Sequence, residues 1–217
     1  MKRIYFLLIC LIAVINVQSQ EREIKIKNRD LKITEILSVL KSDKKIRQGS
    51  YEKYLESPKL NKNILIEKGQ YENNKKVGIW TYYNLKGNIS LQYCFDNDSV
   101  LIYDEFPVYG LKDNRPLLYL GSRDEIQHIC AYGIRIPIEG QMLGQSGKVI
   151  VEIQVSENGD IAEYSVKEGI NKILDNEALR VAKLIPRSWL PAISNGEHIK
   201  FSYRLPFTFA ILGIINN

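Results

Sequence analysis

Apolar and polar residues alternate along two stretches near the C-terminus. In residues 148–155 the apolar positions of one face are Val149, Val151, Ile153 and Val155. In residues 199–209 an apolar side chain stands at every second position. A period of two is typical of a strand with one covered face. Between the first stretch and the apolar positions of residues 161–167, Asn158 and Gly159 favour a hairpin turn because both tolerate positive φ. The pattern predicts an antiparallel sheet.

Two segments carry the helical period that would let helices cover this sheet. In the first, Ser122 and Glu125 have the spacing of a capping box, and Gly133 ends the apolar stripe that begins at Ile126. In the second, Asp175 is placed to cap a helix over residues 174–185. Its expected buried stripe consists of Ala178, Val181, Ala182 and Ile185. The order helix, hairpin, helix, strand predicts an α+β fold, with a small antiparallel sheet covered by helices on one face.

Upstream, residues 49–103 are typical of short strands and turns that recur. Segments starting at Gly49, Gly69 and Leu91 each place a tyrosine two residues later, and their spacings of about 20 residues indicate a repeat array. Asn73 and Asn74 are suited to a turn, since asparagine tolerates a left-handed backbone. We therefore expect an N-terminal β-meander.

The segment before the repeats is charged and has a modest helical pattern. The apolar positions that would line one face are Leu31, Ile33, Ile36, Leu37 and Leu40. Asp30 stands where an N-cap is wanted. We expect a short packing helix here.

The first residues have the pattern of a targeting signal. Lys2 and Arg3 precede an apolar run over residues 4–17, and a cleavage site ending in Ser19 follows. A membrane-spanning helix needs about 20 apolar residues, more than this run supplies. We expect residues 1–19 to be a signal peptide that directs the chain to the periplasm. The alternative is an uncleaved inner-membrane anchor.

Composition excludes several function classes. Hydrophobic residues make up 45% and charged residues 25% of the 217 positions, as in a globular chain. The net charge of +5 is spread along the chain, which argues against nucleic-acid binding. His128 and His198 are the two histidines, and the sequence contains no Ser/His/Asp set, metal-ligand cluster or phosphate-binding glycine loop. We expect no catalysis, cofactor or metal.

Two cysteines remain after the leader. Cys94 and Cys130 fall in what we expect to be different domains, and we interpret them as small buried apolar residues. A disulfide between them is the alternative in an oxidising periplasm.

Pro107, Gly110 and Pro116 punctuate the chain between the repeats and the last hundred residues, which places a domain boundary near Asn114. The expected organisation is a signal peptide over residues 1–19, a charged segment with a short helix over 20–46 and a β-meander over 47–114. An α+β domain over 115–210 and a tail over 211–217 complete the chain.

The repeat region resembles the MORN-like repeats, in particular their antitoxin-type variant. The middle copy supplies the specific residues, with Gly69, Tyr71, Lys76, Gly78 and Trp80 at the family's spacings. In such a meander we interpret the aromatic residues as packing along the sheet. The alternative is a stacking surface for carbohydrate or peptide, made by Tyr71, Trp80, Tyr82 and Tyr93.

A longer series of residues resembles the TonB C-terminal domain family, over about 95 residues. The residues that carry this resemblance are Pro116, Tyr119-Leu120-Gly121, Pro137, Gly147-Lys148-Val149, Val155, Asn158-Gly159, Leu174-Asp175, Glu177-Ala178-Leu179-Arg180, Pro186, Trp189, Pro191, Asn195-Gly196, Leu205-Pro206-Phe207 and Phe209. Their order along the chain is that of the family.

The resemblance implies a mode of binding. In this family a C-terminal strand takes up a short segment, the TonB box, from the plug of an outer-membrane receptor by strand addition. The matching strand here covers residues 199–209, and the family's Tyr-Pro element corresponds to Ile136-Pro137. The predicted protein-binding residues are Arg135, Ile136, Pro137, Ile199, Lys200, Phe201, Ser202, Tyr203 and Arg204. Pro206 removes one N–H from the proposed edge, so we expect pairing mainly upstream of it.

The leading hypothesis is a non-catalytic periplasmic protein that engages TonB-dependent outer-membrane receptors in energy-coupled transmembrane transport. If the N-terminal segment is an anchor, proton-driven motor proteins of the inner membrane become partners as well. The alternative is a structural interaction module of the cell envelope, which binds another protein or forms a homodimer through the same edge.

Overall fold

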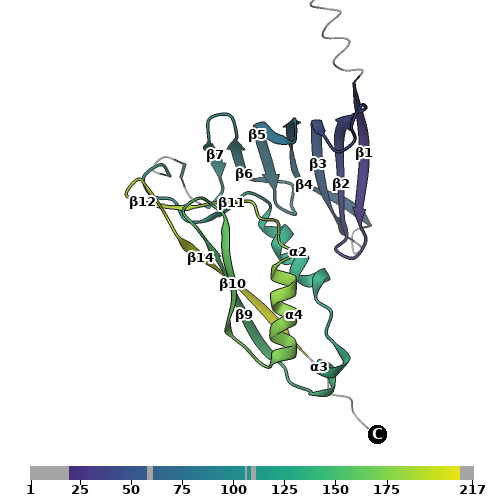
Figure 1. Ribbon diagram of the computed structural model, residues 1–217, viewed down its shortest axis with the longest axis vertical. Helices are drawn as coiled ribbons and strands as arrows, with labels where there is room; N and C mark the ends of the chain where they lie inside the picture. Colours follow the sequence, from purple (N-terminus) through teal and green to yellow (C-terminus); the bar gives the residue numbers. More distant parts are fainter. Residues whose placement is uncertain (1–19, 58–60, 106, 109–110, 211–217) are drawn as a thin grey trace, which may run out of the picture. The chain divides into compact units, whose positions relative to one another are not determined.

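The computed structural model describes residues 20–57, 61–105, 107–108 and 111–210. The chain forms two compact units that divide between Leu101 and Ile102. Figure 1 shows that the first is built of strands and the second of strands and helices. The expected signal peptide over residues 1–19 and the tail over residues 211–217 lie outside the described residues. Among the described residues, no helix has the length and apolar character needed to cross a membrane.

The N-terminal unit is a seven-stranded sheet whose strands follow one another in chain order, which is the topology of a meander. The strands are β1 (Glu21–Asn28), β2 (Ile33–Leu40), β3 (Arg47–Ser57), β4 (Lys62–Glu72), β5 (Lys75–Tyr83), β6 (Ile89–Cys94) and β7 (Ser99–Tyr103). Asn73 and Asn74 form the turn between β4 and β5 with φ of 48° and 69°, the left-handed conformation expected from their side chains.

The helix expected around residues 31–40 is wrong. This stretch is β2, which pairs antiparallel with β1 on one side and with β3 on the other. Leu37 and Val39 are buried, and the β-branched residues of the segment suit a pleated strand better than a helix. The apolar spacing fitted both periods, and the two neighbouring strands decided between them.

Aromatic side chains form the core of this unit, as the packing interpretation predicted. Tyr51, Tyr71 and Trp80 are at most 7% exposed, and their ring centroids lie 5.1–5.4 Å apart. Gly69 permits this packing, since a Cβ atom there would overlap the Trp80 ring. Tyr82 and Tyr93 are also buried. Side chains buried this deeply cannot present a stacking surface to a ligand.

A buried ion triad connects three strands of the same unit. Glu67 on β4 is 3% exposed and accepts from Lys53 Nζ on β3 at 2.7 Å and from Lys76 Nζ on β5 at 2.8 Å. The Lys76 ammonium also lies 3.8 Å from the centroid of the Trp80 ring. Burial alone would raise the pKa of Glu67, but the two ammonium groups outweigh burial and lower it.

In its described residues, the C-terminal unit contains three helices and several short and long strands. They are β8 (Leu118–Tyr119), α2 (Arg123–Gly133), α3 (Ile138–Met142), β9 (Gly147–Val155), β10 (Ile161–Glu168), α4 (Lys172–Ala182), β11 (Trp189–Leu190), β12 (Ala192–Ser194), β13 (Glu197–Ile199) and β14 (Phe201–Phe209). The predicted α+β class, with antiparallel sheets and few helices, is confirmed.

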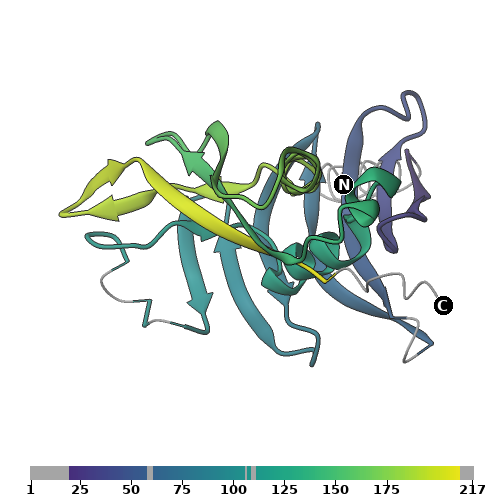
Figure 2. The same ribbon diagram turned by 90° about the horizontal axis from the view of Figure 1, so that it is seen from below.

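The main sheet of this unit has three antiparallel strands in the order β10-β9-β14. The four alternating apolar residues of β9 are fully buried, as their period predicted: Val149, Val151, Ile153 and Val155. Figure 1 and Figure 2 show α4 lying along one face of the sheet. Its stripe of Leu174, Ala178, Val181 and Ala182 has no exposed area. α4 therefore covers one face of the sheet.

The helix caps differ from those expected. Ser122 makes no side-chain cap bond, and Glu125 instead accepts from the Tyr119 hydroxyl at 3.0 Å inside the unit. The second helix is capped by Asn171, whose side chain accepts from the N–H groups of Ile173 and Leu174. Asp175, the expected cap, accepts from the N–H of Ile170. Glu125 and Asp175 thus each accept from a residue five or six positions earlier in the chain, in place of the expected caps.

We predict that Glu67→Gln destabilises the N-terminal unit by about 3 kcal/mol, because it leaves two ammonium groups buried without their carboxylate. Trp80 and Trp189 are the two tryptophans of the chain, so in a Trp189→Phe background Trp80 fluorescence reports this unit alone during denaturant unfolding. The matched control is Glu72→Gln, an exposed carboxylate on the same strand. Equal midpoints for the two variants would refute the structural role of the triad.

The same triad predicts an acid-sensitive unit. The folded state lowers the pKa of Glu67, so its contribution to stability is full above the ordinary carboxyl pKa and is lost as pH falls through the lowered value. We expect the Trp80-reported melting temperature to drop below about pH 4 in the wild type. The drop should be smaller in Glu67→Gln, and identical pH profiles would contradict the prediction.

Candidate protein-binding site

Strand β14 forms one margin of the three-stranded sheet. It pairs with β9 over its whole length, from Phe201 opposite Val155 to Phe209 opposite Gly147, without a shift in register. β9 in turn pairs with β10, which makes β14 an edge strand. Within the part of the chain that the structure describes, β9 is the one strand paired with β14. An edge strand offers unpaired N–H and C=O groups along its outer side.

Pro206 identifies which backbone groups face outward. Proline has no N–H, and within a sheet it is confined to positions whose nitrogen points away from the ladder. Pro206 lies opposite Ile150 in an unbroken register, so its nitrogen faces the open margin. Directions alternate along an antiparallel strand. Ser202, Arg204 and Thr208 therefore direct both N–H and C=O groups outward, while the residues between them bond to β9.

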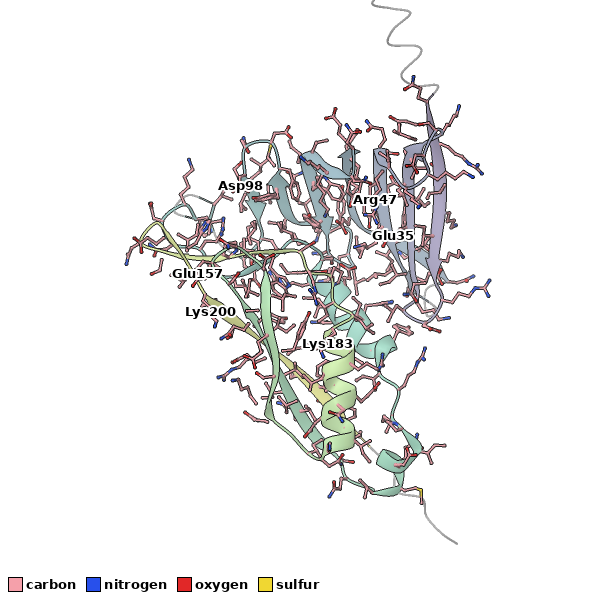
Figure 3. The ribbon with its side chains drawn as sticks, viewed as in Figure 1. Glu35, Arg47, Asp98, Glu157, Lys183 and Lys200 are labelled. Carbon is pink, nitrogen blue, oxygen red and sulfur yellow. The ribbon has the colours of Figure 1, made fainter. Side chains whose placement is uncertain are left out.

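The expected continuous strand over residues 199–209 is interrupted. Ile199 ends β13, where it pairs with Ala192 of β12, and β14 begins only at Phe201. Lys200 lies where the chain passes from one sheet to the other, as can be followed in Figure 3. The apolar alternation continues through residues 199–209, but the two parts of this stretch pair with different strands, β12 and β9.

The helix-facing side of β14 is covered unevenly. Leu205, Phe207 and Phe209 are at most 5% exposed, as in a core. Tyr203 is half-buried, and its ring centroid lies 5.2 Å from that of Trp189. Phe201 is 49% exposed, although the alternation of residues 199–209 predicts that its side chain lies on the covered face. The start of β14 presents a large apolar side chain to solvent.

Charged side chains cross the opposite face of the sheet. Glu152 on β9 lies between Lys167 Nζ of β10, at 3.0 Å, and Arg204 Nε of β14, at 3.7 Å. Hydrogen bonding to Lys167 lowers the pKa of Glu152, and Arg204 adds to the effect. The Arg204 side chain remains 71% exposed, so the guanidinium is accessible at the margin.

The other half of the predicted surface, residues 135–137, connects α2 to α3. The N–H of Arg135 donates to Glu177 Oε1 of α4 at 2.6 Å, and the carbonyl of Ile136 accepts from Gln141 at 3.0 Å. Pro137 is the N-cap of α3. Burial would raise the pKa of Glu177, but Arg180 and the Arg135 N–H lower it. This segment is positioned by α4, whereas β14 is positioned by β9.

A pocket of about 660 Å³ lies beside the start of β14. Its lining includes Ile199 and Phe201 together with Leu111, Arg115, Pro116 and Ala192. No sequence pattern predicted this pocket, because residues 111–116 belong to a stretch expected to be a transition between domains. The alternating residues Ile199 and Phe201 could have been predicted to be exposed only if the end of β13 before Lys200 had been known.

The remaining candidates for chemistry among the described residues are acidic, histidine and cysteine side chains. No group of three or more His, Cys, Asp or Glu side chains is placed there to hold a metal ion. Cys94 and Cys130 are free thiols, both half-buried. Burial raises the pKa of Cys130 to about 11, so this thiol is protonated at neutral pH.

Comparison with known proteins supports part of this interpretation. Residues 134–211 match the family model described as Gram-negative bacterial TonB protein C-terminal, which is more than a third of the chain. No curated protein matches the chain.

Among solved structures, the chain is similar to the NMR solution structure of the Helicobacter pylori TonB-CTD. The identity is 22%, the TM-score is 0.31, and the alignment covers 40% of this chain and 78% of that chain. A likeness of that size adds no argument about function. The MORN-like repeats expected upstream remain a prediction. The family match supports a TonB C-terminal domain over residues 134–211, the part of the chain that contains α3, β9, β10, α4 and β14.

Proposed function

We propose that this chain is a non-catalytic protein of the cell envelope that binds a receptor segment by strand addition to β14. The partner is a segment of the TonB-box kind from the plug of a TonB-dependent outer-membrane receptor, and the process served is energy-coupled transport. The observation that carries the proposal is the open outer margin of β14, in a unit whose family match is to the TonB protein C-terminal. Main-chain hydrogen bonds at such a margin supply affinity for an extended peptide.

The chemistry of the margin favours its first half. Ser202 and Arg204 supply outward N–H and C=O groups there, whereas Pro206 has no N–H to donate. Lys200 is exposed and Arg204 is largely so. An incoming strand would therefore pair mainly between Phe201 and Leu205, and acidic residues in it would be favoured by the two cations.

Location follows from the same proposal. The plug segment of such a receptor is accessible from the periplasm. The C-terminal unit therefore acts in the periplasm, after cleavage of a signal peptide over residues 1–19. If that segment instead stays as an inner-membrane anchor, proton-driven motor proteins become additional partners. The N-terminal sequence of the protein isolated from cells separates these forms.

A second candidate uses the same edge without transport. An open edge strand can also pair with a second copy of the chain or with another envelope protein. In that case receptor segments would not compete with the partner for binding to β14. Pull-down of the full chain against outer-membrane receptors, with excess receptor-segment peptide as competitor, distinguishes the two. Capture that the peptide abolishes favours the transport role.

We predict that Ser202→Pro weakens peptide binding about tenfold, the scale of one or two main-chain hydrogen bonds lost at the margin. The substitution removes an N–H that points outward, as the nitrogen of Pro206 does, and it keeps the hydrogen bonds between β14 and β9. Binding is measured by calorimetry with receptor-segment peptides.

Ser202→Ala is the matched control, because it removes the hydroxyl and keeps the N–H. A melting temperature within a few degrees of the wild type for both variants confirms that the fold is retained. Unchanged affinity in Ser202→Pro, or no binding by the wild type at about 1 mM peptide, would overturn the proposal.

A further inference from the structure

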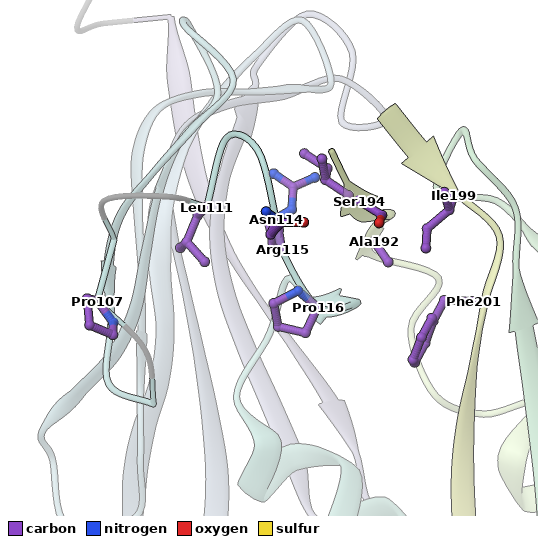
Figure 4. A pocket seen from close by; sticks show the side chains of 10 residues that line it. Pro107, Leu111, Asn114, Arg115, Pro116, Ala192, Ser194, Ile199 and Phe201 are labelled. Carbon is purple, nitrogen blue, oxygen red and sulfur yellow. The ribbon is translucent and has the colours of Figure 1, made fainter. Parts of the chain in front are cut away.

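The pocket at the start of β14 is a built feature of the C-terminal unit. One wall is formed by Pro107 and by Leu111 and residues 114–116, and the other by the β12–β13 hairpin with Phe201. In Figure 4, Phe201 and Ile199 face Pro116 across the hollow, and Leu111 stands beyond it. With a volume of about 660 Å³, the pocket has room for a large side chain.

Hydrogen bonds hold the first wall in place. Arg115 and Ile193 exchange two backbone hydrogen bonds of 2.9 and 2.8 Å, and the Arg115 guanidinium donates to the carbonyl of Pro191 at 3.0 Å. Asn114 Oδ1 accepts from the N–H of Asn195 at 3.2 Å. The wall is therefore fixed before any ligand arrives. It also precedes residues 134–211, so it is outside the segment that matches the family model.

Apolar surface is exposed at this place and covered further along the same strand. Phe201 is 49% and Ile199 36% exposed, whereas Phe207 and Phe209 on the same face of β14 are at most 2% exposed. Large apolar side chains left uncovered beside a concave apolar surface are typical of binding sites. The uncovered apolar surface of β14 is therefore limited to the start of the strand.

Strand geometry connects this pocket to the open margin. Residues that lie directly opposite each other on paired strands direct their side chains to the same face. In a strand added to β14, the residue opposite Phe201 therefore directs its side chain toward the pocket. The residue opposite Arg204, three positions away, faces the other side of the sheet, where the guanidinium is 71% exposed.

We propose that the pocket is the anchoring subsite for one bulky apolar side chain of the segment that adds to β14. The preferred segment then has a Leu, Ile or aromatic residue opposite Phe201 and an acidic residue three positions away, opposite Arg204. This inference rests on the proposed function, because strand addition is what brings that side chain over the pocket. The pocket sets the register of the incoming strand, which main-chain hydrogen bonds alone do not specify.

Synthetic peptides of nine residues, the length of β14, test the subsite in the full chain. The apolar-anchor peptide carries Leu and Glu three positions apart in an otherwise Thr and Val sequence, and is made in both orders. The blank peptide has Ala in place of Leu. The protein variants are Phe201→Ala, which removes one wall, and Phe201→Leu, which keeps an apolar wall.

We expect Phe201→Ala to weaken the apolar-anchor peptide about tenfold, the scale of burying one aliphatic side chain, and to weaken the blank peptide much less. Phe201→Leu should retain most of the affinity. Since Phe201 is half exposed, its loss should change the melting temperature little. Ser202→Pro should weaken both peptides alike, because both use the backbone margin.

Each other result has a definite meaning. If Ser202→Pro weakens both peptides and Phe201→Ala weakens neither or both equally, the subsite is overturned and strand addition stands. If Ser202→Pro has no effect on either peptide, the proposed function fails independently of the pocket. If no peptide binds and a concentration-dependent dimer is lost in Phe201→Ala, a second copy of the chain occupies the pocket and the inference is wrong.

Discussion

The central strand β9 is the element on which the rest of the C-terminal unit depends. Its four inward side chains are fully buried under the helices, and it hydrogen-bonds to β10 on one side and β14 on the other. A slip of one residue would turn all four side chains to solvent, so the register is strongly specified. Because β14 is aligned on β9, that register also decides which backbone groups of β14 face outward.

An open sheet margin is a hazard as well as a binding surface, since it invites pairing with any exposed strand. Here the margin carries several features that limit such pairing, namely the exposed Lys200, the exposed Arg204 and the ring of Pro206. The uncovered Phe201 is the exception. Protection along most of the strand and exposure at its start are what a selective binding edge requires, and they fit the proposed function better than a general contact surface.

Carboxylates connect neighbouring elements in both units. Glu67 joins three strands of the N-terminal sheet through two lysines. Glu177 joins α4 to the chain after α2 by accepting from the N–H of Arg135, and it pairs with Arg180 of its own helix, which donates to the carbonyl of Gly133. In each case opposite charge and hydrogen bonds offset the cost of burying the carboxylate. Such contacts are specific in geometry, so they fix how elements pack rather than merely holding them together. The segment around Arg135 owes its position to one of them.

The sequence by itself determined those elements whose side chains repeat with a single period. The alternation in β9 and in β14 from Phe201 onward, and the stripe of α4, could be recognised because burial of one face requires that pattern whatever the neighbours are. Tertiary structure decided the rest. The apolar spacing in residues 31–40 fitted both helix and strand until β1 and β3 supplied backbone partners. Glu125 does not form its predicted cap, because it accepts a hydrogen bond from the Tyr119 hydroxyl. The strand predicted over residues 199–209 is interrupted at Lys200, because Ile199 pairs with β12 and the residues from Phe201 onward pair with β9. The pocket beside Phe201 joins residues about 90 positions apart in the chain, and no local pattern records which distant segment will stand opposite an exposed side chain.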